Sequence, residues 1–172
     1  KNGALKWEKQ LNRNKRFRDL DSDILVENNF LYVLGYDDAA YCLRAATGET
    51  VWKAEKGGGG YGSFLTTKNR LYFPTTSGEF VAINKETGQR IWSYNLKEGI
   101  ATSASFFKGL LVFGESQGSL LFVDARNGKP ISSFAPGRGL LATPTVDETT
   151  QSIFFISGES NLYHLKAGWT SQ

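Results

Sequence analysis

The sequence predicts an all-β protein made of repeated four-stranded antiparallel sheets, and three observations support this. A glycine turn recurs at Gly48, Gly88 and Gly128, which are 40 residues apart, and Trp52 and Trp92 follow the first two glycines after four residues. Short apolar runs bounded by polar turns recur at the same spacing. No segment shows the sustained 3.6-residue periodicity of an amphipathic helix. A self-similar period of about 40 residues is typical of a repeat architecture.

Each repeat contains the same succession of elements. A weak first strand ends in a polar turn and leads into an apolar second strand. We expect the second strands at 30–34, 71–73, 110–113 and 153–156. A tight polar turn then leads into the third strands, expected at 39–44, 79–84, 119–124 and 161–165. The glycine turn opens the fourth strand, because a short hairpin loop needs a residue that adopts a positive φ.

The second strands are continuously apolar, as expected where both faces of a sheet are buried. Four-stranded sheets stacked face to face around an axis provide that environment, and repeats of about 40 residues match one blade each. The sequence therefore predicts a β-propeller domain over 1–172, with four blades near 19–55, 62–96, 101–135 and 142–168. Pro130 suits the outer strand of its blade, and Pro74 is expected to mark a β-bulge.

The two ends of the chain each carry part of a blade. Residues 4–10, which contain Trp7, are expected to form an isolated fourth strand, whereas the last repeat has only three strands. We expect residues 4–10 to serve as the outer strand of a shared blade, in a dimer of eight blades or in a closed four-blade ring. The absence of a signal peptide and of methionine suggests a mature, trimmed or excised chain.

Composition limits the chemistry that is available. The formal net charge is +3, and only 13–18 concentrates basic residues, which argues against a nucleic-acid binder. Cys42 is the only cysteine and His164 the only histidine, so an internal disulfide is impossible and a thiolate metal site is not expected. Both side chains are expected to pack within a blade, and no apolar run is long enough for a spanning helix.

Two short motifs have a catalytic reading that their context does not support. Residues 57–62 satisfy the dinucleotide-binding glycine pattern, but a strand rather than a helix is expected to follow. Residues 114–118, with Ser116 at their centre, match a nucleophile elbow, but they occupy the hairpin between the second and third strands. We therefore expect two loops, no cofactor and no enzyme activity.

Several segments together resemble a known family. They are Asp19-Leu20-Asp21 leading into 24–35, residues 43–52, and 101–103 followed by 109–118. With the Gly-x-x-x-Trp turn, they make the chain similar to the PQQ-type propeller superfamily and, within it, to the C-terminal half of the eight-bladed BamB family. The resemblance implies a lipid-tethered scaffold on the periplasmic face of the bacterial outer membrane, which binds the POTRA domains of BamA. A quinoprotein-type enzyme fragment or another periplasmic binding protein is the alternative.

The resemblance also implies a partner contact through Asp19 and Asp21. Carboxylates one residue apart on an extended segment point the same way and can grip one arginine or backbone amide. The alternative is that one aspartate caps the turn. The basic segment, including Arg16 and Arg18, is expected either to steer an acidic partner or to be a solvated loop. Trp7, Trp52 and Trp92 are expected to pack between blades, and Gly48, Gly88 and Gly128 are likewise expected to be structural residues of the blades.

Overall fold

The computed structural model describes residues 3–11, 22–35, 39–55, 60 and 62–168, and these ranges form β-strands joined by turns. The strands pair only with their neighbours in the chain. The first sheet contains β1 (Leu25–Glu27), β2 (Phe30–Gly35), β3 (Ala39–Arg44) and β4 (Thr50–Glu55). The second contains β5 (Leu65–Thr66), β6 (Arg70–Pro74), β7 (Glu79–Asn84) and β8 (Arg90–Asn95). The third contains β9 (Ser105–Phe107), β10 (Leu110–Gly114), β11 (Leu120–Asp124) and β12 (Pro130–Phe134). The fourth contains β13 (Thr145–Asp147), β14 (Ser152–Ile156) and β15 (Leu162–Lys166).

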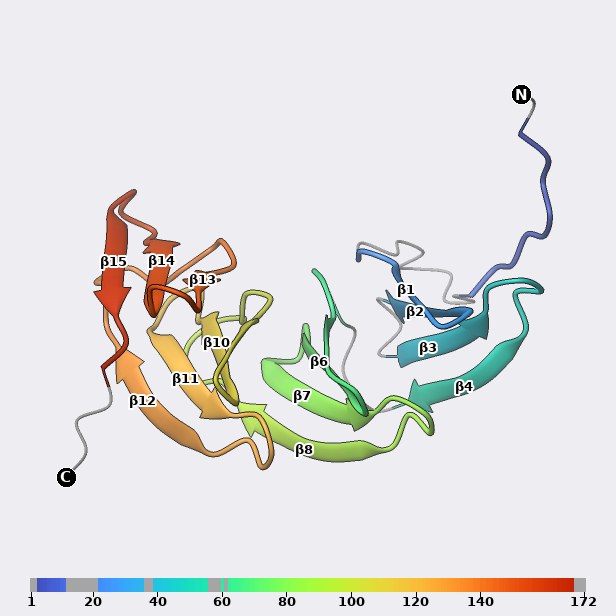
Figure 1. The fold of residues 1–172 in the computed structure, drawn as a ribbon, viewed down its shortest axis with the longest axis horizontal. Helices are drawn as coiled ribbons and strands as arrows, with labels where there is room; N and C mark the ends of the chain where they lie inside the picture. The colour runs from blue at the N-terminus through green and yellow to red at the C-terminus, as the bar shows by residue number, and fades with distance from the viewer. Residues whose placement is uncertain (1–2, 12–21, 36–38, 56–59, 61, 169–172) are drawn as a thin grey trace.

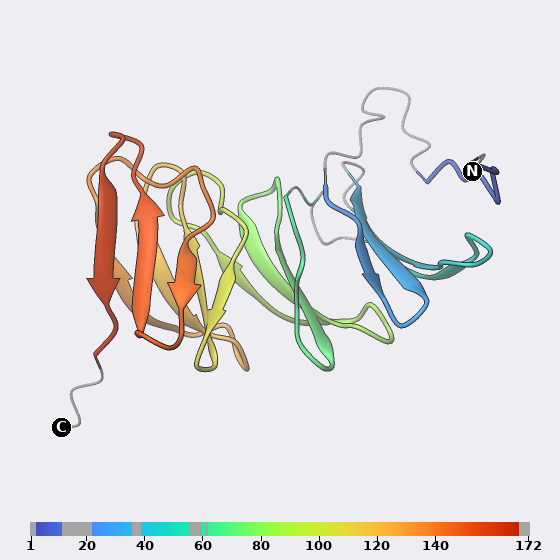
Figure 2. The same cartoon turned by 45° about the horizontal axis from the view of Figure 1, so that its top comes forward.

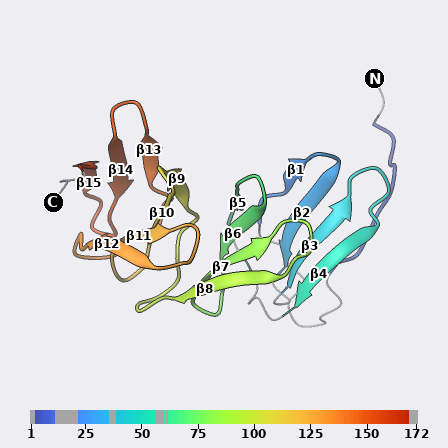
Figure 3. The same cartoon turned by 60° about the horizontal axis from the view of Figure 1, so that its bottom comes forward.

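The four sheets stand side by side as blades, which confirms the predicted propeller fold (Figure 1). The outer strands β4, β8 and β12 run along the convex edge of an open arc, and the two ends of the chain lie at opposite ends of it. Turned views show the same succession of separate sheets (Figures 2 and 3). The closed four-blade ring is therefore not the arrangement of this chain. No helix occurs in the described ranges, so none is available there to cross a membrane.

Burial of the second strands follows from this stacking. All five residues of β10 are buried, because a blade covers each face of its sheet. In β14 burial alternates, and Phe154 and Ile156 are 37% and 49% exposed. The reason is that β14 belongs to the last blade, which no further blade of this chain covers. The same face carries Leu162, which is 73% exposed.

Residues 4–10 form no strand within this chain, because no neighbouring strand in it offers them a ladder of hydrogen bonds. One local expectation was wrong. Pro74 causes no bulge, and its pairing with Phe80 keeps the register of β6 with β7. It is the last residue of β6, and β5 pairs only with Leu71 and Tyr72 before it. The irregularities lie instead between third and fourth strands, at Cys42/Leu43, Ala82/Ile83 and Phe122/Val123.

The tryptophans join each blade to the next by a repeated contact. Trp52 on β4 covers Gly88 of the second blade, and its indole N–H donates to the Lys85 carbonyl at 3.1 Å. Trp92 on β8 covers Gly128 in the same way. A Cβ at either glycine would lie within 2.7 Å of the indole ring, and both glycines have φ above +70°. Only glycine meets both conditions without strain.

Trp7 makes this contact although its segment is not in a sheet. Its indole covers Gly48, and its N–H donates to the Ala45 carbonyl at 2.9 Å. Lys9 Nζ donates to the Gly48 carbonyl at 2.8 Å and to Thr50 Oγ1 at 2.6 Å. Residues 4–10 therefore lie against the first blade where the outer strand of a preceding blade would lie.

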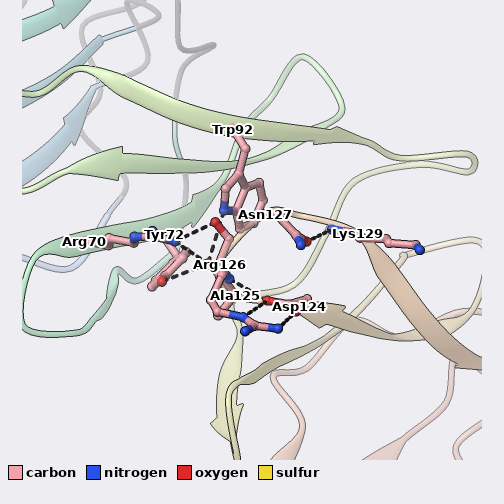
Figure 4. Close-up of polar contacts among 8 residues, drawn as sticks. All are labelled: Arg70, Tyr72, Trp92, Asp124, Ala125, Arg126, Asn127 and Lys129. Atoms are coloured by element: carbon pink, nitrogen blue, oxygen red, sulfur yellow. Dashed lines mark hydrogen bonds and ion pairs between the residues drawn. The ribbon is translucent and has the colours of Figure 1, made fainter.

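Polar side chains reinforce the contact between the second and third blades (Figure 4). The Ala125 carbonyl accepts hydrogen bonds from Arg70 Nη1, the Tyr72 hydroxyl and the Trp92 indole, at 2.9–3.1 Å. Beside it, hydrogen bonds from the Arg126 side chain, and then from its backbone N–H, lower the pKa of Asp124. The turn that receives Trp92 is thus held from several directions.

A partly buried ion pair reinforces the contact between the first and second blades. Lys85 is 7% exposed, and its Nζ donates to Glu27 Oε2 at 2.7 Å, Thr66 Oγ1 at 2.9 Å and the Thr67 carbonyl at 2.8 Å. These three acceptors satisfy all the donors of the ammonium group. Burial of its charge therefore costs less than burial of an unpaired one would.

The contacts predict that each tryptophan stabilises the fold. Trp52→Ala and Trp92→Ala should each lower the free energy of unfolding by about 3–5 kcal/mol, because a large side chain is lost where two blades meet. Denaturant unfolding followed by circular dichroism measures this. The control is Ile91→Ala, since Ile91 lies on the same strand but is 40% exposed. Equal stability of Trp92→Ala and the control would contradict the role assigned to the indole.

Candidate partner-binding face

One end of the blades carries the loops that are best placed to meet a partner. In each sheet the strands follow one another in sequence order, and each is antiparallel to the next. The hairpin between the second and third strands therefore lies at the same end of the blade as the link into the next blade. We call this end the loop face. Within the described residues it comprises parts of 22–24, 60–64, 75–78, 96–104, 114–119, 135–144 and 157–161.

Asp19, Asp21, Arg16 and Arg18 lie outside the described residues, but both neighbours of their segment are described. Before the segment, Leu11 packs against Tyr41 and Leu43. After it, the Ser22 hydroxyl donates to the Leu34 carbonyl at 3.0 Å. Leu34 and Tyr41 flank the β2–β3 hairpin. The described residues on either side of 12–21 are therefore both held against the first blade, Leu11 on one face of β3 and Ser22 at the loop face.

Hydroxyl groups connect the links of neighbouring blades on this face. Ser63, Ser103 and Thr143 occupy the same place in successive repeats, 40 residues apart. The Ser63 hydroxyl donates to Asp23 Oδ2, and the Ser63 N–H donates to Ser103 Oγ at 2.9 Å. The Asp23 N–H donates to the Gly62 carbonyl at 3.1 Å. The loops of the first three blades are thus held to one another and not only to their own strands.

A pocket of about 320 Å³ lies among the loops of the second, third and fourth blades. Its lining combines hydroxyl groups of Ser63, Thr102 and Thr143 with apolar side chains such as Ile100 and Leu141. Ile100 is 43% exposed and Leu141 is 78% exposed. None of the lining residues titrates near neutral pH, so the pocket provides apolar contact and hydrogen bonds.

Ser116 lies in the β10–β11 turn and is engaged in holding a loop. Its hydroxyl accepts a hydrogen bond from the Ile100 N–H at 3.0 Å. Next to it, Glu115 is 3% exposed and accepts from the Lys97 N–H at 2.8 Å. Burial, and then the charge of Glu115, raise the pKa of Tyr94. A strand precedes and follows this turn, whereas a nucleophile elbow needs a helix after it.

The other residues considered for chemistry lie apart from one another. His164 on β15 stacks on Phe154, with ring centroids 4.6 Å apart, and its Nε2 lies 2.9 Å from Ser152 Oγ. Cys42 on β3 is 2% exposed, and burial raises its pKa to about 11. In the described ranges, no three His, Cys, Asp or Glu side chains group closely enough to hold a metal ion. The glycine segment ends in Gly60 and Gly62 and leads to β5, not to a helix.

The buried charged residues and the hydroxyl series were not predicted from the sequence. Lys85 stands where the sister repeats have Ala45 and Ala125, and Glu115 stands where another has Thr75. A charged residue at a position that is small or neutral in other repeats was the available signal. The 40-residue spacing of Ser63, Ser103 and Thr143 is also visible when the repeats are compared with one another.

Known proteins share both the sequence pattern and the fold. The family model described as outer membrane protein assembly factor BamB matches residues 1–170. Outer membrane protein assembly factor BamB of Legionella pneumophila (strain Paris) is 26% identical over 148 residues, which cover 86% of this chain and 38% of that protein. The chain therefore spans about two fifths of that curated relative.

Solved structures agree on the fold. The crystal structure of BamB from Moraxella catarrhalis superposes with a TM-score of 0.74 at 17% identity, over 89% of this chain and 48% of that one. A quinohemoprotein alcohol dehydrogenase from Pseudomonas putida HK5 superposes with a TM-score of 0.69 at 16% identity, over 78% of this chain and 28% of that one. The enzyme therefore shares the blade architecture, whereas the family model covers nearly the whole sequence. The chain belongs to the BamB family of outer membrane protein assembly factors.

Proposed function

We propose that this chain is a non-enzymatic scaffold of the machinery that assembles proteins in the bacterial outer membrane. The observation that carries the proposal is the match of the BamB family model to residues 1–170. The loop face supports it, because its described residues provide hydrogen-bonding and apolar groups on blades held firmly together. Family membership further places the proposed site of action on the periplasmic side of the outer membrane.

The partner that we propose is the array of POTRA domains of BamA, bound at the loop face. Asp19 and Asp21 would provide paired carboxylates for an arginine or a backbone amide of the partner. Arg16 and Arg18 would raise the association rate toward acidic surface. Support comes from the described neighbours of this segment, since Ser22 is held at the loop face and Leu11 packs on β3 of the same blade.

The second candidate is a quinoprotein-type enzyme fragment. The blade architecture shared with a quinohemoprotein dehydrogenase is the observation in its favour. Against it, such enzymes are expected to use calcium-binding carboxylates, a catalytic aspartate and commonly a vicinal disulfide. The chain has a single cysteine, so it cannot form that disulfide.

The open ends of the arc suggest how the propeller is completed. We propose that residues 4–10 of a second copy pair with the free edge of β15. Trp7 would then link blades across the junction through the contact that it already makes with Gly48 and the Ala45 carbonyl. Two such junctions would create an eight-blade ring with twofold symmetry and would cover Phe154, Ile156 and Leu162.

Completion by a second copy predicts a dimer in solution. Light scattering with size-exclusion chromatography should give twice the chain mass of 19.0 kDa. Deletion of residues 1–10 should yield a monomer, because it removes the added strand but none of the fifteen described strands. A monomeric full chain in which amide exchange shows β15 unprotected would contradict this proposal.

The scaffold proposal predicts that Ser116 and His164 carry no chemistry. Ser116→Ala and His164→Ala should leave assembly of outer-membrane barrels unchanged, because both side chains serve only local contacts. Complementation of a strain that lacks the family member measures this, in a full-length relative that carries each variant. Loss of function in a variant with an unchanged melting temperature would instead support the enzyme.

The partner proposal predicts that the aspartate pair acts by contact. Asp19→Ala with Asp21→Ala should weaken binding to cognate POTRA domains by about tenfold or more, as expected for truncated charge-assisted hydrogen bonds. Surface plasmon resonance gives the affinity, and thermal unfolding shows whether the fold is retained. The control is Glu86→Ala, an exposed acidic residue in the β7–β8 turn at the opposite end of the blades. Full binding by the double variant, or binding lost only through unfolding, would leave turn capping as the role of the pair.

A further inference from the structure

The contact between the third and fourth blades lacks the tryptophan that joins the others. In the first two sheets the tryptophan pairs with a small residue of the third strand, Trp52 with Cys42 and Trp92 with Ala82. In the third sheet the same register pairs Ser132 with Phe122. Phenylalanine on the neighbouring strand replaces part of the lost volume, but it projects from a different backbone position.

A pocket of about 280 Å³ lies at this place. Ser132 lines it, together with apolar side chains of both blades. They include Phe107, Phe122, Ile131, Phe134, Ile153 and Leu165. An engineered apolar cavity of about 150 Å³, made by shortening one large side chain, takes up benzene. The present pocket is larger, is partly open to solvent, and lies where a short residue stands at the position of a large one.

The far side of the pocket preserves the acceptor that the indole groups use elsewhere. In each of the first three blades, one backbone N–H donates to a carbonyl in the turn between the first and second strands; the donors are Ala45, Lys85 and Ala125. In the fourth blade the Ala167 N–H donates to the Gln151 carbonyl in the same way, at 2.9 Å. Ala167 therefore holds the position whose carbonyl receives an indole N–H in the first three blades. Ala167 also lines the pocket.

The Ala167 carbonyl retains capacity for a ligand. The Gln151 amide, in the orientation that satisfies its neighbours, donates to this carbonyl at 3.3 Å. A carbonyl oxygen has two lone pairs, and the equivalent Ala125 carbonyl accepts three donors.

We propose that this pocket is a binding site for a small planar aromatic molecule of indole size that carries an N–H donor. Three equivalent places in the same chain hold an indole, with one face on the turn and the N–H on a backbone carbonyl. At the fourth place the covalently attached indole is missing, while the apolar walls and the carbonyl position remain. The counterpart of the turn glycine is Thr170, which lies outside the described residues. The free ligand would take the place of the missing side chain and bury the apolar walls.

Indole is the probe, and its binding to the full chain is measured by isothermal titration calorimetry. Ser132→Trp should abolish binding and raise the melting temperature, because the attached side chain occupies the pocket. If crowding by Phe122 prevents this variant from folding, Ser132→Leu should weaken binding by about tenfold or more through partial filling. The control is Ser93→Trp, which adds a tryptophan on exposed β8 and should leave binding unchanged. Unchanged indole affinity in a folded Ser132→Trp or Ser132→Leu variant would overturn the proposal.

A matched gain of binding tests the same idea in reverse. Trp92→Ser creates the equivalent vacancy opposite Ala82, so the folded variant should bind indole at one additional site. Absence of a second site in this folded variant would show that the geometry does not select indole.

Trp169→Ala checks whether the chain itself supplies the ring, since Trp169 follows Gly168, a lining residue. An affinity for indole that is the same in the Trp169→Ala variant and the unchanged chain supports a free ligand. Indole binding that is seen only in Trp169→Ala would overturn the proposal.

Discussion

The architecture depends on one contact, in which an indole ring on the outer strand of a blade covers a glycine in the turn of the next. A sheet with two apolar faces can stack in several registers, so burial alone does not determine how neighbouring blades align. The indole N–H adds a direction, because it must reach one backbone carbonyl, and the glycine adds a distance, because no Cβ fits beneath the ring. Apolar stacking supplies most of the stabilisation, whereas this contact selects the alignment.

The three contacts between blades differ in what surrounds that position. A buried lysine with three acceptors supports the first, and an arginine and a tyrosine on a shared carbonyl support the second. The third relies on aromatic packing, in which Phe134 meets Phe155 and Tyr163 with ring centroids 5.8 and 5.6 Å apart. The loss of tryptophan there leaves the blades in register, because Ile153, Phe155 and Leu140 remain buried against the third sheet. It also leaves space that a ligand can fill.

A scaffold needs loops that keep their shape while the residues at their tips vary. In this chain, hydroxyl groups at equivalent places tie neighbouring loops to one another, and the strands below them are buried on both faces. Ser116 and Glu115 accept backbone hydrogen bonds from the 97–100 link and so serve this arrangement. Ser116, which resembles a catalytic residue by motif, therefore holds a loop, and the described part of the loop face offers hydroxyl and apolar groups for recognition.

The sequence by itself determined the fold class, the strand order and the positions of the joining glycines and tryptophans, because a 40-residue repeat presents the same local pattern several times. It could not decide whether residues 4–10 form a strand, since a strand exists only where a neighbouring edge provides hydrogen bonds. It misjudged Pro74, whose effect depends on where the adjacent strand ends. It did not reveal the ion pair of Lys85 with Glu27, the hydroxyl series or the pocket beside Ser132. These features join residues from different blades, so only the stacking of the sheets decided which side chains meet.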